Sequence, residues 1–160
     1  MPLPYKPVVI LGEHERVGGP PILDGFILTG TDNYTLARFR IDTGADRTLI
    51  GPGDREALGI DLESLPLSDQ VTITANGLVR MHEVTIGLGF RTLDGALAHA
   101  GLTVAVAPHQ ISDYEAPSLL GLDFLYRLNL TVEPTHSRLQ GLAPYDSSAN
   151  TYSLERRIPS

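Results

Sequence analysis

The sequence has no cysteine among its 160 residues, only one lysine, Lys6, and no long apolar run. The absence of cysteine excludes disulfides, thiol nucleophiles and thiolate metal ligands. The eleven arginines are scattered and the net charge is −7, so we expect no basic face for nucleic acid. No stretch approaches the roughly 18 apolar residues of a membrane span, and the N-terminus lacks the apolar segment of a signal peptide. We therefore expect a cytoplasmic protein without nucleic-acid or membrane partners.

Patterns typical of metal and phosphate sites are also missing. The histidines include no His-x-x-x-His pair, and His82-Glu83 is not followed by the spacing of a zinc-binding helix. Neither a Gly-x-Ser-x-Gly motif nor a phosphate-binding loop is present. We expect no metal and no cofactor.

The length suits one domain with a real core, and most of the regular signals are those of short strands. Asn76-Gly77 stands between two β-rich runs within residues 71–86 and predicts a tight hairpin. At most one or two helical turns are expected at 54–58, stopped by Gly59. Residues 1–25 hold five of the twelve prolines and suggest an irregular arm around one short strand, and residues 143–160 suggest a polar tail. The other expected strands are 8–11, 26–29, 34–41, 49–50, 102–106, 118–120 and 130–133, and 138–142 is a segment that can pair back on the last of these.

One strand leads directly into an Asp-Thr-Gly sequence. Along 34–41 apolar and arginine side chains alternate, so a hairpin delivers Asp42 at its exit, followed by Thr43 and Gly44. The hydroxyl can orient neighbouring backbone, and the glycine lets backbone approach closely. This setting suits a carboxylate that must face another carboxylate and share a proton and a water molecule with it. The alternative is an aspartate that only caps a turn after a strand.

A second signature lies near the C-terminal end. A strand ending at Leu120 breaks at Gly121 into a short helix whose leucines can line a core face, and Asn129 is expected as its left-handed stop. Asp123 is interpreted as an acid at the start of that helix rather than as a catalytic group.

Taken together, three motifs resemble the retropepsin-like aspartic peptidases, the single-lobed relatives of pepsin that include the retroviral proteases. The motifs are Asp42-Thr43-Gly44-Ala45 after an apolar strand, the Asn76-Gly77 hairpin, and Leu119-Leu120-Gly121 before a short helix. The resemblance covers about residues 26–142 as the protease domain, leaving 1–25 as an N-terminal arm and 143–160 as a C-terminal tail. It implies a mostly β, single-lobed acid-protease fold, a closed β barrel with one short helix after the Leu-Leu-Gly signature.

The resemblance also implies roles for the first motif. Asp42 would be the catalytic carboxylate, Thr43 would hydrogen-bond across a two-fold axis, and Gly44 would keep the carboxylates coplanar. A bilobed enzyme of this class carries two such motifs, whereas this chain has one, because 23–25 and 93–95 are interpreted as turns. An active enzyme would therefore be a homodimer.

Four further residues are implied to bind an extended peptide or protein substrate. Ala45 and Asp46 would line the cleft, and Asn76 and Gly77 would form the tip of a flap over it. Leu122 stands where retroviral enzymes commonly have an arginine that braces the acidic residue after Asp-Thr-Gly-Ala. Asp46 therefore has either another partner or no bracing role.

The sequence leaves alternatives to a general aspartic endopeptidase. A catalytically silent relative would keep the fold for dimerisation or peptide binding, since a fold does not guarantee an activity. An enzyme that processes only itself or one partner is a further possibility.

Overall fold

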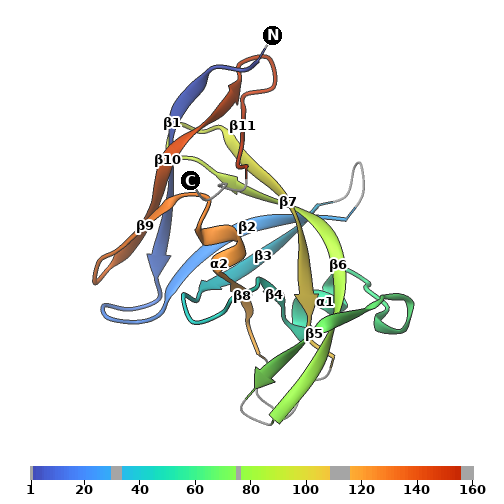
Figure 1. Cartoon of the computed structure of the whole chain (residues 1–160). Coiled ribbons are helices and arrows are strands. Elements are labelled where there is room, and N and C mark those ends of the chain that lie inside the picture. The colour runs from blue at the N-terminus through green and yellow to red at the C-terminus, as the bar shows by residue number, and fades with distance from the viewer. Residues whose placement is uncertain (1, 30–33, 75–76, 109–115, 156–160) are drawn as a thin grey trace.

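The computed structural model describes residues 2–29, 34–74, 77–108 and 116–155, and within these ranges strands dominate (Figure 1). The helical elements are short: α1 (Pro52–Ala57), the 3-10 turn η1 (Leu62–Ser64) and α2 (Leu122–Leu125). No helix in these ranges is long and apolar enough to cross a membrane. The strands are β1 (Tyr5–His14), β2 (Pro21–Leu28), β3 (Tyr34–Ile41), β4 (Leu49–Ile50), β5 (Leu67–Thr74), β6 (Gly77–Arg91), β7 (Leu97–Val106), β8 (Ser118–Leu120), β9 (Asn129–Val132), β10 (His136–Asp146) and β11 (Thr151–Ser153).

The strands form one sheet that closes on itself. Their order is β1-β10-β11-β7-β4-β8-β3-β2-β6-β5, and β9 pairs with β10. Additional pairings of β6 with β7 and of β1 with β2 close the path into a barrel. The expected mostly β, closed barrel with a short helix after Leu-Leu-Gly is confirmed.

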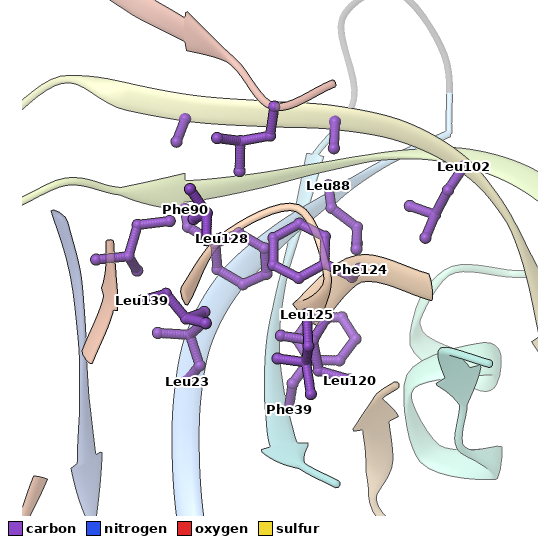
Figure 2. Packing of buried hydrophobic residues seen from close by; sticks show 14 of the residues in the cluster. Leu23, Phe39, Leu88, Phe90, Leu102, Leu120, Phe124, Leu125, Leu128 and Leu139 are labelled. Carbon is purple, nitrogen blue, oxygen red and sulfur yellow. The ribbon is translucent and has the colours of Figure 1, made fainter. Parts of the chain in front are cut away.

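An aromatic cluster fixes the strand that leads to the Asp-Thr-Gly motif. Phe39 of β3, Phe90 of β6 and Phe124 of α2 are all fully buried. Ring centroids lie 6.1 Å apart for Phe39 and Phe90, and 5.1 Å apart for Phe90 and Phe124. Figure 2 shows these rings within the same cluster of apolar side chains. Side chains alternate between the two faces of a strand. Because Phe39 points into the core, the residues directly before and after it in β3 face outwards.

Strands occur near both ends of the described chain, so the expectation of an irregular arm and a polar tail was wrong, although the short strand expected at 8–11 lies within β1. β1 pairs with β10 from Tyr5↔Pro144 to Glu13↔His136. β2 and β10 each run across one of the expected domain boundaries, at 25/26 and 142/143. The N-terminal prolines hid the strand signal, but β1 is an edge strand over most of its length, where a missing N–H is tolerated.

The structure also tests three local expectations. Residues 23–25 were expected as a turn, but they lie inside β2, where a Cβ on Gly25 would come within 2.4 Å of the Phe90 ring. Residues 93–95 do form the turn between β6 and β7. Asn129 does not stop the helix in a left-handed conformation, because it is the first residue of β9 and pairs with Gln140. Extended pairing of the backbone outweighs the local preference of asparagine.

The buried Tyr152 ties the C-terminal strand to the β6–β7 turn. Its hydroxyl donates to Asp94 Oδ2 at 2.8 Å, and the ring is 2% exposed. Burial, followed by the hydrogen bond to Asp94, raises the pKa of Tyr152 from 10.0 to about 12. Because the pKa of Tyr152 is higher in the folded than in the unfolded protein, it stabilises the fold fully at pH values below the pKa of the unfolded protein. This stabilisation is lost as the pH rises through the pKa of the folded protein.

We expect Tyr152→Phe to lower the free energy of unfolding by about 2 kcal/mol at neutral pH, because a hydrogen bond to a charged acceptor is lost. The difference from the parent should shrink as the pH rises from 10.0 towards about 12. Urea denaturation at several pH values measures both effects. Tyr145→Phe is the control, since the one hydrogen bond of its hydroxyl to the described part of the chain goes to the exposed Asn150. Equal losses in the two variants, or a pH-independent difference, would contradict this account.

The predicted hairpin is present as β5 and β6, which pair antiparallel up to Thr74↔Gly77. Gly77 has a φ of 112°, a backbone conformation that favours glycine. Asn76, the other expected residue of the hairpin tip, lies outside the described residues. The α1 helix and its stop at Gly59, with a φ of 66°, are also as expected.

Candidate active site

Asp42 lies at the end of β3, where the backbone holds it in a defined position. Its N–H donates to Leu120 O at 3.0 Å, continuing the parallel pairing of β3 with β8. Gly44 N donates to Asp42 Oδ1 at 2.9 Å, and Ala45 N donates to Asp42 O at 3.2 Å. Asp42 is half-buried, while Thr43 and Gly44 are exposed. The motif therefore presents an oriented carboxylate at the protein surface.

The two sequence signatures meet because the start of α2 binds the loop after Asp42. Leu122 N donates to Ala45 O at 2.8 Å, and Asp123 N donates to Asp46 O at 3.2 Å. The first N–H groups of a helix have no partner within the helix, so the loop carbonyls satisfy them. A Cβ on Gly121 would lie 2.4 Å from the carbonyl carbon of Arg47, which explains why a glycine stands there.

Thr48 and Asp123 form a second connection that the sequence analysis missed. Asp123 Oδ1 accepts from Thr48 N at 2.9 Å and from Thr48 Oγ1 at 2.7 Å. The same hydroxyl accepts from Gly121 N at 3.1 Å, and Thr48 is fully buried. Asp123 is at the start of α2 as expected, but its carboxylate binds the loop of Asp42 rather than only the helix end. The signal for this connection in the sequence is a polar residue, Thr48, between a turn and a strand.

Replacing Thr48 with valine should therefore lower the free energy of unfolding by about 2–3 kcal/mol, since buried polar groups lose their partners. Thermal or urea denaturation measures the change. Thr85→Val is the matched control, because its hydroxyl bonds to Thr103 at an exposed position and to no other residue that the structure describes. This change should stay within about 0.5 kcal/mol. A Thr48→Val protein as stable as this control would show that the buried contacts contribute little.

The arginine after Asp46, rather than Asp46 itself, makes an ion pair. No ion pair of Asp46 occurs within the described ranges, and its side chain is exposed. Arg47 Nη1 lies 2.8 Å from Glu83 Oε1 and 3.1 Å from Ser68 Oγ. The hydrogen bond from Ser68, and then Arg47, lowers the pKa of Glu83 from 4.5. The open question about a partner for Asp46 is thus answered for the described part of the chain: no arginine braces it there.

The remaining expected site residues lie in two separate segments of the chain. Ala45 and Asp46 follow the Asp-Thr-Gly motif directly, and Asp46 borders a surface hollow with Glu83 and Asp123. Gly77 is exposed at the start of β6. Substrate-binding roles for these residues and for Asn76 stay predictions, as do the roles of Asp42, Thr43 and Gly44. No group of three or more candidate metal ligands occurs among the residues that the structure describes.

Comparison with known proteins agrees with this arrangement. Residues 29–124 match the aspartyl protease family, a range that includes β3, the Asp42 loop and the start of α2. The structure is similar to the crystal structure of a retropepsin-like aspartic protease from Rickettsia conorii, with a TM-score of 0.62 and 21% identity, over 89% of this chain and 97% of that one. No curated protein matches the sequence. The chain belongs to the aspartyl protease family, and its fold is retropepsin-like.

Proposed function

We propose that the protein is an aspartic endopeptidase that acts as a homodimer. The observation that carries this proposal is the surface position of Asp42, with Oδ1 oriented by Gly44 N at 2.9 Å within the single Asp-Thr-Gly of the sequence. One motif supplies one carboxylate, so the second must come from another copy of the chain across a two-fold axis. Membership of the aspartyl protease family supports this choice.

In the proposed mechanism the two Asp42 carboxyl groups share one proton, because two carboxylates a few ångströms apart cannot both ionise cheaply. The ionised group removes a proton from a water molecule, and the water oxygen attacks the peptide carbonyl carbon. The protonated group gives its proton to the carbonyl oxygen, forming a neutral tetrahedral intermediate. The carboxyl group that took the proton from water then gives it to the leaving nitrogen, while the other carboxylate takes a hydroxyl proton from the intermediate; the C–N bond breaks, and the dyad again holds one proton. The pair titrates as a unit.

The neighbouring residues have supporting roles in this proposal. Thr43, exposed beside Asp42, hydrogen-bonds across the dimer axis, and Gly44 leaves room for substrate. Ala45 and Asp46 line the cleft, while the β5–β6 hairpin covers an extended peptide that binds by strand addition. The reaction needs no metal or cofactor, since the two carboxylates supply both acid and base. A cytoplasmic location also belongs to this proposal.

Cleavage of a peptide library by the purified protein, from about pH 3 to 7, tests the proposal. We expect cleavage whose rate rises faster than linearly with protein concentration until the dimer is saturated. Sedimentation at the same concentrations measures the dimer. Absence of cleavage where the protein is dimeric would contradict the proposal and favour a peptide-binding relative without catalysis.

A further inference from the structure

The base of the β5–β6 hairpin is joined to the loop of Asp42 by side chains that no sequence motif identifies. Arg47 Nη1 contacts Glu83 Oε1 of β6 at 2.8 Å and Ser68 Oγ of β5 at 3.1 Å. One guanidinium nitrogen therefore holds both strands of the hairpin. We name the three residues Arg47, Ser68 and Glu83 the hairpin brace.

The brace differs from the exposed ion pairs of the molecule in its burial. The side chains of Arg47 and Glu83 are 21% and 29% exposed, whereas those of Arg38 and Asp24 in the exposed pair are 63% and 70% exposed. Ser68 is 1% exposed. Exposed pairs contribute little because water screens them, while a partly buried pair is screened less and its loss leaves a charge without its partner.

The loop side of the brace is rigidly attached. Thr48, which follows Arg47, is bound to Asp123, and Thr48 O accepts from Ala105 N at 3.0 Å. Ala105 is the β7 residue that pairs with Glu83 in β6. Arg47 and Glu83 are therefore linked twice, once by their side chains and once by the backbone through β7. The side-chain contact restricts how β6 can move relative to Asp42.

The hairpin side of the brace lies far from the hairpin tip. Glu83 is six residues from Gly77, about 20 Å along an extended strand at roughly 3.3 Å per residue. Glu83 N also donates to Pro66 O at 3.0 Å, so the two strands are held together at the same level. A small rotation at the base would move the tip by a larger distance, and the base is where the brace acts.

We infer that Arg47 and Glu83 are positioning residues for peptide cleavage, which set the height of the hairpin above the Asp42 loop. This inference rests on the proposed function. Neither side chain takes part in the chemistry. Their contact keeps the backbone of the hairpin where it can pair with an extended substrate, so its loss weakens substrate binding more than it slows the bond-breaking step.

A double-mutant cycle tests the inference. Arg47→Ala and Glu83→Gln should each lower kcat/KM by about tenfold, mainly through KM, and the double variant should be no worse than either single one. The double variant R47E/E83R, in which the two charges are exchanged, should recover at least half of the kcat/KM that the single variants lose. Glu133→Gln is the matched control, because it removes one carboxylate from an exposed 2.8 Å pair with His136 on the β9–β10 hairpin.

Hydrogen exchange of the peptide-free protein supplies a readout that does not depend on cleavage. Arg47→Ala should speed exchange of backbone amides in 67–74 and 77–83 and leave those of β1 and β10 unchanged. Unchanged exchange in the hairpin, or multiplicative effects in the cycle, would overturn the inference. A shift in cleavage preference without faster exchange would also overturn it and assign Arg47 to direct substrate contact. If the parent shows no cleavage, the proposed function fails, while exchange still decides whether the brace holds the hairpin.

Discussion

Replacing Asp42 with asparagine is expected to abolish peptide cleavage without unfolding the protein. The amide cannot take a proton from water, so kcat/KM should fall by at least about a thousandfold. The amide oxygen can still accept the hydrogen bond that Gly44 N donates to Asp42 Oδ1 at 2.9 Å, so the loop should keep its conformation. Steady-state kinetics on a peptide cleaved by the parent measure the loss, and sedimentation measures the dimer.

Asp24→Asn is the control for this change, because Asp24 forms an exposed pair with Arg38 on β2 and β3. It should cleave at the parental rate. An Asp42→Asn protein that retained more than a tenth of the parental activity would show that another group activates the water. A loss of the dimer in this variant alone would instead show that Asp42 acts on assembly.

Gly121→Ala is expected to have the largest effect on stability. The new Cβ would lie 2.4 Å from the carbonyl carbon of Arg47 and 2.9 Å from Ala45 O, both backbone atoms that cannot rotate away. The loop of Asp42 or the start of α2 must shift, at a cost of about 3 kcal/mol. Urea denaturation measures the change, and cleavage should fall with it because the shifted loop carries Asp42.

Gly101→Ala provides the matched control for this substitution. A Cβ on Gly101, an exposed residue of β7, meets no atom of the described residues within 4 Å. This variant should be as stable as the parent or slightly more stable, since alanine restricts the unfolded chain. If Gly121→Ala were equally well tolerated, the close approach of Gly121 to the Asp42 loop would not constrain the site.

The parts of the fold that the sequence predicted depend on local signals. Alternation along β3 identified the face of Phe39, and Asn76-Gly77 predicted the hairpin of β5 and β6. The break at Gly121 separated β8 from α2 correctly. Each of these signals arises from residues that are neighbours in the chain, so no knowledge of distant partners was needed.

The parts that the sequence did not predict depend on partners far apart in the chain. β1 begins at Tyr5, before the expected strand 8–11, and its first residues pair with Pro144, Ala143 and Leu142 of β10. Thr48 meets Asp123 only after β8 has been placed between β3 and β4. The sequence shows that Arg47 is charged but not which carboxylate it meets. Such pairings follow from the closed barrel and not from any local pattern.

The most direct test of the central claim, one carboxylate from each of two chains, is to titrate the parent with the Asp42→Asn protein. Both proteins are kept above the dimer dissociation constant, and subunit exchange is verified with two affinity tags. If dimers form at random, an equal amount of the variant should lower the activity of a fixed amount of parent to about half, and a ninefold excess to about a tenth. Unchanged activity of the parent despite complete subunit exchange would contradict a dyad shared between two chains.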